Sequence, residues 1–467
     1  MSSFSNTTRR SFLKRSAATA AVVGFPTILP SSLFGQYAPS KRINVGAIGC
    51  GRISRVHDLP GIWQFDNARI MAVADLYAPR VDEAKRYINE HYSKKTGKAY
   101  DGVTGYTNYH DLLANKDIDA VVISTPDHQH AIVAVDAVRA GKDVYLQKPA
   151  SLTIAEGRYL SDAVQASGRI LQIGSQQRSW VQFRYAAELV RNGRIGDLKH
   201  VEIGLPGDPA GGNPTPMTVP AGFQYDAWLG STPEVTYTVD RCMPTTGFDR
   251  PGWLRMEQFG AGMITGWGAH HVDSAHWAMN TEYTGPIEVW GNAEFPHYPP
   301  DKPGLWDVHG KFLTHAIYAN GVTMDISGDF PNGIKFYGTK GWLFVTRTEQ
   351  TTPTDPGGHP VGGKKATGLD ASDPAILSSV IGPDEVHLYK STDQHGNWLD
   401  CIISRQAPIS PVEMGHRACS TCLVHHIAMH AEGKHLHWDP ERERFRNDEA
   451  ANARLSRPQR PPYTFSA

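Results

Sequence analysis

Short apolar runs alternate with helix-like patterns through the first half of the chain. Each run is rich in Val, Ile and Ala and ends in polar or glycine residues, as in strands that are buried on both faces. The candidate strands are Ile43–Ile48, Arg69–Ala74, Val103–Tyr106, Ala120–Ser124, Val144–Leu146 and Ile170–Ile173. Between two of them lies the helical pattern Ala131–Val138, which Gly141 ends. This alternation predicts an α/β fold with a doubly wound parallel sheet.

The pattern changes in the second half. Apolar and polar residues alternate strictly in Thr323–Gly328 and in Ile334–Gly338, and few helical patterns separate such segments. This favours a large, mostly antiparallel open sheet. Residues 351–375 are rich in Gly, Pro, Asp and Thr and are predicted to form a long loop.

A chain of 467 residues is too long for one hydrophobic core. We divide it into an N-terminal signal segment (1–38), a nucleotide-binding Rossmann domain (39–168) and a second domain (169–467). The second boundary follows a helix that begins with the capping box Thr153-x-x-Glu156 and stops at Gly168.

A glycine turn follows the first strand and predicts a dinucleotide site. Gly49 allows the sharp turn, and Gly51 lets the backbone approach a pyrophosphate. Arg52 and Ile53 open the next helix, whose free N–H groups face the anion. The third small position of the motif is Ser54. An ordinary βα turn is the alternative interpretation.

Asp75 ends the second strand, where an acid accepts hydrogen bonds from ribose hydroxyls. A carboxylate there repels a 2′-phosphate, so we expect NAD rather than NADP.

Two further turns end predicted strands at the same edge of the sheet. Thr125, Pro126 and His130 follow one strand and are expected to contact the cofactor. Lys148 follows another, and Pro149 restricts its backbone. A lysine beside a nicotinamide can donate to a substrate oxygen or, as the amine, take its proton. A surface lysine at a strand end is equally consistent with the spacing.

A glycine-rich segment leads into a predicted helix that carries His270, Asp273 and Trp277 on one face. Asp273 is placed to orient His270 or to raise its basicity. The alternative is a metal site that adds His271 and His276. Their spacing is not His-x-x-x-His, so we expect no metal here.

The chain resembles the glucose–fructose oxidoreductase, inositol dehydrogenase and rhizopine-catabolism (Gfo/Idh/MocA) family. The resemblance rests on Gly49 and Gly51, Thr125-Pro126 with His130, Lys148-Pro149, Gly268-x-His270-x-x-Asp273 and the turn Gly338–Trp342. It implies a Rossmann domain, a second α/β domain whose open sheet forms an oligomer contact, and NAD(P)-dependent oxidation of a sugar or cyclitol hydroxyl. It also implies that Lys148 and His270 are the catalytic lysine and histidine. From the helical spacing we add Asp273 as a third candidate catalytic residue.

Two positions depart from the pattern of that family. Gln147 replaces the usual Glu before Lys148, and Gly266 stands where the family has a catalytic aspartate. His395 and Trp398 are candidates to enter the pocket from the C-terminal part, although a structural role is slightly favoured.

Composition excludes several other classes of protein. Forty-six Lys and Arg against forty-seven Asp and Glu give no charge that would attract nucleic acid, and no later segment is long enough to span a membrane. Cys419 and Cys422 form a single Cys-x-x-Cys, which we interpret as two core residues of a helix.

Arg9 and Arg10 precede a mildly apolar stretch, Ala17–Phe34, that Gly24 and two prolines interrupt. This is typical of twin-arginine export and predicts the export machinery as a partner and a periplasmic location. A basic disordered tail is the alternative. Because the periplasm is not expected to supply free NAD, the cofactor should stay bound and be recycled internally.

The leading hypothesis is therefore an exported, homo-oligomeric NAD-dependent oxidoreductase acting on a carbohydrate hydroxyl, with His270 or Lys148 as base. One alternative is glycoside cleavage by transient oxidation and elimination. Another is a non-catalytic periplasmic carbohydrate-binding protein, which the loss at Gly266 supports.

Overall fold

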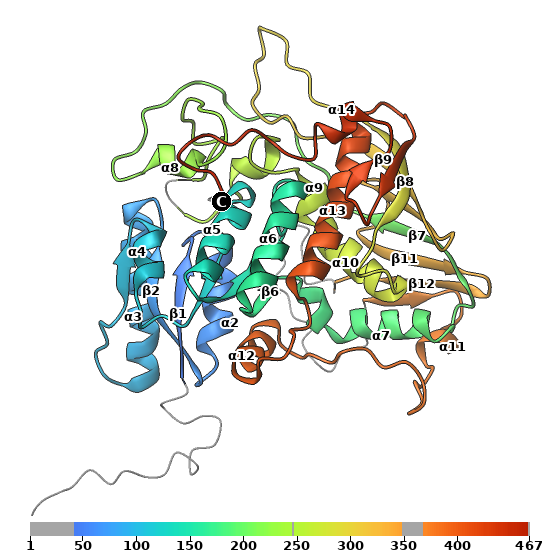
Figure 1. Ribbon diagram of the computed structural model, residues 1–467, viewed down its shortest axis with the longest axis horizontal. Coiled ribbons are helices and arrows are strands. Elements are labelled where there is room, and N and C mark those ends of the chain that lie inside the picture. The colour runs from blue at the N-terminus through green and yellow to red at the C-terminus, as the bar shows by residue number, and fades with distance from the viewer. Residues whose placement is uncertain (1–41, 245–246, 348–367, 466–467) are drawn as a thin grey trace, which may run out of the picture. The chain divides into compact units, whose positions relative to one another are not determined.

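Two β-sheets organise the chain, and they confirm the predicted fold class (Figure 1). The computed structural model describes residues 42–244, 247–347 and 368–465. Residues 43–467 belong to one compact unit. The proposed export segment with Arg9 and Arg10 lies outside the described residues.

The first sheet has six strands in the order β3-β2-β1-β4-β5-β6, and all its pairs are parallel. Its strands are β1 (Ile43–Ile48), β2 (Ala68–Ala74), β3 (Thr104–Tyr106), β4 (Ala120–Ile123), β5 (Asp143–Leu146) and β6 (Leu171–Ile173). All six predicted strands are thus confirmed, because continuous apolar runs suit a sheet with both faces covered.

Five α-helices accompany this sheet, and they follow the predicted alternation. They are α2 (Leu59–Trp63), α3 (Ala78–Thr96), α4 (Tyr109–Ala114), α5 (Asp127–Arg139) and α6 (Ile154–Ser167), with the π-helical turn η4 (Ser54–Asp58) before α2. The predicted capping box of α6 is present: Thr153 Oγ1 accepts from the N–H of Glu156, and Glu156 accepts from the N–H of Thr153. The six-stranded sheet and these helices form the Rossmann layer of the molecule.

The second sheet has nine strands in the order β13-β12-β11-β7-β10-β9-β8-β14-β15. Only β7 and β10 pair in parallel, so the sheet is mostly antiparallel, as predicted. The strands are β7 (Leu198–Gly204), β8 (Pro286–Ala293), β9 (Phe312–Tyr318), β10 (Thr323–Ser327), β11 (Gly333–Gly338), β12 (Gly341–Val345), β13 (Leu369–Ala371), β14 (Leu436–Asp439) and β15 (Arg444–Phe445).

The predicted loop 351–375 needs a correction. Its described end forms strand β13 and the start of helix α11 (Pro374–Leu377), because Leu369–Ala371 pairs with the edge strand β12. Residues 351–367 lie outside the described residues.

Three helices pack on one face of the second sheet: α7 (Val181–Arg191), α10 (Gly268–Met279) and α13 (Val412–Met429) (Figure 1). Cys419 and Cys422 are buried in α13, as predicted, and all five cysteines are free. The remaining helices are the 3₁₀ turns η5 (Gln176–Ser179) and η6 (Gly252–Arg255), with α8 (Tyr225–Leu229), α9 (Met263–Gly266), α12 (Gln394–Ser404) and α14 (Glu449–Asn452).

The C-terminal part of the chain returns to the first sheet. Helix α12 packs against α2 and β5, and Figure 1 shows it beside the Rossmann layer. Trp398 is fully buried there in the same core as β1 and β2, which gives it the structural role that was favoured. Residues of α12 therefore pack against β5 of the first sheet, although the two elements lie far apart in the sequence.

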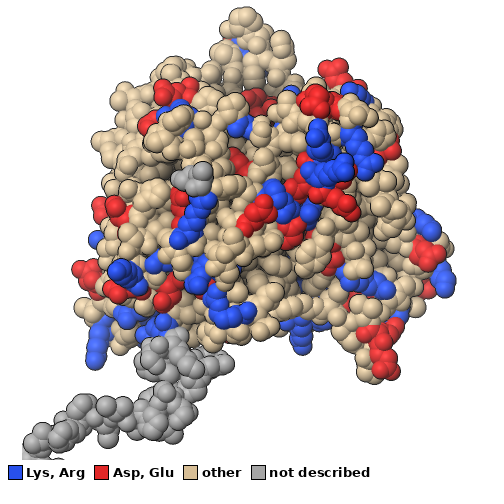
Figure 2. All heavy atoms as spheres, in the orientation of Figure 1, with Lys and Arg blue, Asp and Glu red and all other residues tan. Residues whose placement is uncertain are grey.

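Acidic and basic side chains are interspersed over the face shown in Figure 2. Among the described residues, no helix is long and apolar enough to cross a membrane.

Candidate active site

A cavity lies where β1, β4 and β5 end, and residues 248–254 and 263–270 of the second domain close its other side. Parallel strands place their following turns at one edge of the sheet, so turns that are distant in sequence meet there. The predicted site residues that line this cavity are Gly49, Gly51, Arg52, Ile53, Asp75, Thr125, Pro126, His130, Lys148 and His270. Asp273 does not line it.

The glycine turn has the geometry that a pyrophosphate needs. Gly49 has φ +87°, and a Cβ there would lie 2.7 Å from the carbonyl oxygen of Ser124. At Gly51, by contrast, a Cβ would meet no atom within 4 Å, so open space faces this backbone. A helical segment begins at Arg52, and the first N–H groups of a helix are available to an anion. These residues fit a bound dinucleotide.

Asp75 is fixed at the end of β2. Its carboxylate accepts hydrogen bonds from the N–H of Cys50 (2.8 Å) and of Tyr77 (2.9 Å). Burial raises the pKa of Asp75 above its usual value, and the two backbone donors oppose that shift. The carboxylate therefore ties the glycine turn to β2 and presents a negative wall where a ribose would lie.

His130 fastens two turns of the cavity to each other. Its Nδ1 lies 2.6 Å from the carbonyl oxygen of Pro149, and its Nε2 lies 2.9 Å from that of Thr125. Burial lowers the pKa of His130 to about 4, and the two backbone carbonyls oppose that shift. Its polar atoms thus hold the protein together at the cavity wall.

Lys148 and Asp127 form the charged centre of the cavity. The Nζ of Lys148 donates to the backbone carbonyl of Gly266 at 2.6 Å. Burial lowers the pKa of Lys148, and the negative charge of Asp127 opposes this. Burial likewise raises the pKa of Asp127, which is 4% exposed, and Lys148 opposes that shift. Gly266, which stands where the family has an aspartate, thus still contacts Lys148 through its backbone carbonyl. Asp127 supplies a carboxylate from another turn.

Sequence reasoning had not assigned a role to Asp127. It lies within the turn that ends β4 and opens α5, where an acid also suits the helix N-terminus. The available signal was an acid at the start of the helix that follows a buried strand.

His270 faces the cavity from the first turn of α10. It is 1% exposed, and neither of its ring nitrogens has a hydrogen-bond partner among the described residues. Burial lowers its pKa well below the ordinary histidine value. A neutral, buried imidazole of this kind can bind a substrate hydroxyl.

The expected pairing of Asp273 with His270 is not present. The carboxylate of Asp273 instead receives two hydrogen bonds from Arg178, at 2.6 and 2.8 Å. Both side chains are almost completely buried, so the carboxylate of Asp273 is neutralised by Arg178 inside the protein. Helical spacing gave the correct face, but it could not show that an arginine from η5 packs there.

The neighbouring histidines of α10 also have separate partners. His271 Nε2 lies 2.9 Å from Asn332 Oδ1, and His276 Nε2 lies 2.8 Å from the hydroxyl of Tyr318.

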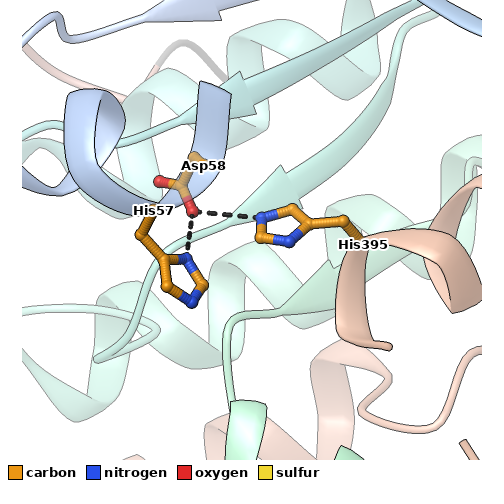
Figure 3. Close-up of side chains that lie close together, drawn as sticks. All are labelled: His57, Asp58 and His395. Carbon is orange, nitrogen blue, oxygen red and sulfur yellow. Dashed lines mark hydrogen bonds and ion pairs between the residues drawn. The ribbon is translucent and has the colours of Figure 1, made fainter. Parts of the chain in front are cut away.

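A buried carboxylate supports the cavity from behind (Figure 3). Asp58 accepts from Ser124 Oγ at 2.6 Å and from Gln147 Nε2 at 2.7 Å, and both donors line the cavity. His57 and His395 each place a ring nitrogen 3.1 Å from the same carboxylate. Burial opposes the charge of Asp58, but the hydrogen bonds from the two histidines keep its pKa below its usual range.

This arrangement explains why Gln147 stands where the family has a Glu. Gln147 cannot supply a negative charge, but its amide binds the carboxylate of Asp58. His395 reaches Asp58 from α12 and stacks on Tyr145 at 4.4 Å between ring centroids, so it acts behind the cavity rather than inside it. Neither Asp58 nor His57 was predicted, because a single His-Asp pair in a helical pattern carries no signal of its own.

Two arginines complete the cavity wall. Arg250 and Arg347 line it from the second domain, and the guanidinium of Arg347 lies 4.5 Å from the ring centre of Trp267. The cavity therefore combines a dinucleotide cradle with a cluster of acid, base and cationic side chains, as a redox or acid–base enzyme requires.

Comparison with known proteins defines the class to which the cradle belongs. Residues 43–175 match the model of an oxidoreductase family with an NAD-binding Rossmann fold (GFO_IDH_MocA). The matched part of the chain is similar to the NAD-binding Rossmann domain of that oxidoreductase family.

Several curated proteins resemble this region. The chain is 32% identical over 157 residues to the uncharacterized oxidoreductase YrbE of Bacillus subtilis, covering 34% of this chain and 42% of that protein. It is 30% identical over 155 residues to inositol 2-dehydrogenase of Salmonella typhimurium, covering 33% and 43%. It is 32% identical over 210 residues to glycosyl hydrolase family 109 protein 2 of Shewanella, covering 42% and 45%. The chain spans less than half the length of these relatives.

Solved structures share the whole architecture. An aldose–aldose oxidoreductase from Caulobacter crescentus, complexed with glycerol, has a TM-score of 0.56 at 18% identity and covers 85% of this chain and 99% of its own. The WlbA dehydrogenase of Bordetella pertussis, in complex with NADH and UDP-GlcNAcA, gives 0.56 at 17% identity with coverage of 85% and 99%. Likeness at this identity establishes the two-domain fold.

Proposed function

We propose that this protein is an NAD(P)-dependent oxidoreductase acting on a hydroxyl group of a sugar, cyclitol or glycoside. One observation carries the proposal: Lys148, Asp127 and His270 line the same cavity as the glycine turn and Asp75. A substrate placed between them would lie against the cofactor. The similarity to inositol 2-dehydrogenase supports a polyhydroxylated substrate.

The residues divide the chemistry in the following way. A nicotinamide cofactor held by the glycine turn would supply the hydride acceptor for the carbinol carbon. Lys148 removes the hydroxyl proton at Nζ, and its lowered pKa makes the amine form accessible near neutral pH. His270 donates to or accepts from a second substrate hydroxyl through its free ring nitrogens. Asp127 holds the ammonium form that Lys148 takes after it accepts the proton.

The direct test uses purified protein and defined substrates. Absorbance after denaturation would show whether nucleotide co-purifies, and NMR would follow labelled inositol, aldoses and glycosides. We expect an oxidised product, together with NADH or a reduced second substrate in matching amount. No change in any substrate would contradict the proposal and favour a binding protein.

Glycoside cleavage is the second candidate. The similarity to a protein named glycosyl hydrolase family 109 protein 2 favours it, since that match also covers the longest stretch quoted above. The same residues would serve this reaction, because removal of a proton next to a transiently oxidised carbon also needs a base. Release of the aglycone without net NADH formation would distinguish cleavage from oxidation.

We also propose that the protein is exported by the twin-arginine machinery to the periplasm, works as a homo-oligomer, and binds NAD more tightly than NADP. The sequence Arg9-Arg10 and the position of Asp75 support the first and last of these. Replacing Arg9 and Arg10 by Lys should hold the protein in the cytoplasm, as fractionation would show. Retention of NAD through purification of the exported form would support internal recycling.

A further inference from the structure

A second cluster of histidine and carboxylate side chains lies in the second domain. Glu257 Oε1 lies 2.7 Å from His430 Nε2 and 3.5 Å from His426 Nε2. The three ligand atoms all lie within 4.8 Å of one another, and the two imidazole rings are nearly perpendicular at 87°. All three side chains keep partial exposure, between 10% and 25%, so an ion from solvent can reach them.

The local fold explains why these groups converge. His426 and His430 are four residues apart at the end of α13, which places both rings on one face of the helix. Glu257 follows the 3₁₀ turn η6, and its backbone N–H donates to Asp307 at 2.8 Å. The carboxylate is therefore held opposite the last turn of α13.

A third histidine lies beside this pair. His309 is 1% exposed, and neither of its ring nitrogens has a hydrogen-bond partner in the described parts of the chain. Its ring centre is 6.0 Å from that of His426. Its Nε2 lies 4.0 Å from Asp208 Oδ2, beyond hydrogen-bond distance, so this buried imidazole lies next to the cluster and faces a carboxylate on its other side.

We propose that Glu257, His426 and His430 bind one divalent transition-metal ion. Zinc is the class of ion that fits. Tetrahedral bonds of about 2.0–2.1 Å place ligand atoms about 3.3 Å apart. The 3.5 Å between Glu257 and His426 is close to this value, and the 2.7 Å hydrogen bond between Glu257 and His430 would have to lengthen slightly. Arg454 and Arg457 lie within electrostatic range of Glu257 and work against a further positive charge. The two imidazole ligands favour zinc over Mg²⁺ or Ca²⁺, which depend on several oxygen ligands.

The cluster around Asp58 has the same composition but cannot take this role. Its carboxylate already accepts from Ser124, Gln147 and two histidines. An ion there would have to displace hydrogen bonds that hold the cavity wall. In the Glu257 cluster, an ion would replace one hydrogen bond, from His430 to Glu257, and would link α13 to the segment whose Trp253 and Leu254 line the cavity.

The test measures metal binding directly and needs no turnover. Full-length protein is stripped with a chelator, titrated with Zn²⁺ by calorimetry, and loaded with Co²⁺ for visible absorption. We expect one zinc per chain and a Co²⁺ spectrum of low coordination number. Because loss of an outer-shell partner alone weakens metal affinity by about 10- to 100-fold, His430→Gln or Glu257→Gln should weaken it by at least about 100-fold. His57→Gln, in the other cluster, is the matched control and should bind zinc like wild type.

Circular dichroism of each variant shows whether weaker zinc binding comes from loss of the metal-ligating side chain or from unfolding. Glu257→Gln is a second variant, at a partly exposed residue. The proposal is overturned if the wild-type protein binds no zinc. It is equally overturned if folded His430→Gln and Glu257→Gln variants bind zinc as tightly as the His57→Gln control.

Discussion

The two sides of the cavity are built in different ways. The nucleotide side comes from one stretch of chain, β1, the glycine turn and β2, and it acts through backbone geometry at Gly49 and Gly51. The reaction side brings Lys148, Asp127 and His270 together from three separate elements. Its function depends on side-chain charge in a buried setting rather than on backbone conformation.

This difference has consequences for substitution. A backbone cradle tolerates changes in side-chain chemistry but not in side-chain volume, because the ligand approaches the main chain itself. The reaction side tolerates small changes of volume but not of proton-transfer chemistry. Substitutions on the two sides should therefore separate nucleotide binding from turnover.

The largest effect is expected for Lys148→Ala. A positioned acid–base group contributes about 10²–10⁴-fold to a rate, so kcat should fall by about that factor. The nucleotide should remain bound, since the cradle is untouched. Initial rates and nucleotide titration measure the two quantities, with Lys94→Ala on the exposed side of α3 as control. Turnover within a few-fold of wild type would remove Lys148 from the mechanism.

Glycine substitutions test the other side. Gly51→Ala places a methyl group in open space that the pyrophosphate needs, so nucleotide affinity should fall about tenfold or more, or about 1.4 kcal/mol, with the melting temperature unchanged. Gly49→Ala should also destabilise the fold, by about 1–3 kcal/mol, because φ is +87°.

Calorimetry of nucleotide binding and thermal denaturation of Gly51→Ala and Gly49→Ala separate the loss of space for the pyrophosphate from backbone strain. If Gly51→Ala bound nucleotide as wild type does, the cradle would not be the binding site.

The contrast between the two sides also explains what the sequence could predict. The six strands and the glycine turn follow from local pattern, since continuous apolar runs and a turn after a strand are visible in one window. Lys148 and His270 could be singled out because each stands in a distinctive turn. The partner of Asp273 could not, because Arg178 reaches it from 95 residues away. Asp58 was missed for the same reason: its meaning comes from His395, 337 residues further on.

A smaller effect is expected for Asp75→Asn. Removal of the negative charge ends the repulsion of a 2′-phosphate, while one side-chain oxygen still accepts from Cys50 or Tyr77. The preference for NAD over NADP should fall about three- to tenfold, which is below about 1.4 kcal/mol. Competitive binding of the two nucleotides measures it. An unchanged preference would show that Asp75 only fastens the turn to β2.

The smallest expected effect is a shift in pH dependence on the reaction side. If neutral Lys148 is the base, the rate of oxidation increases as the pH rises through the pKa of Lys148. The rate is lost as the pH falls below that pKa. Burial puts that midpoint below the ordinary lysine value of 10.5. The charge of Asp127 raises the same pKa, so Asp127→Asn should move the midpoint to lower pH and leave the plateau rate nearly unchanged. Rate profiles across the neutral and alkaline range measure this shift. Were His270 the base instead, its strongly lowered pKa would leave the profile flat through neutrality, and Asp127→Asn would not move it.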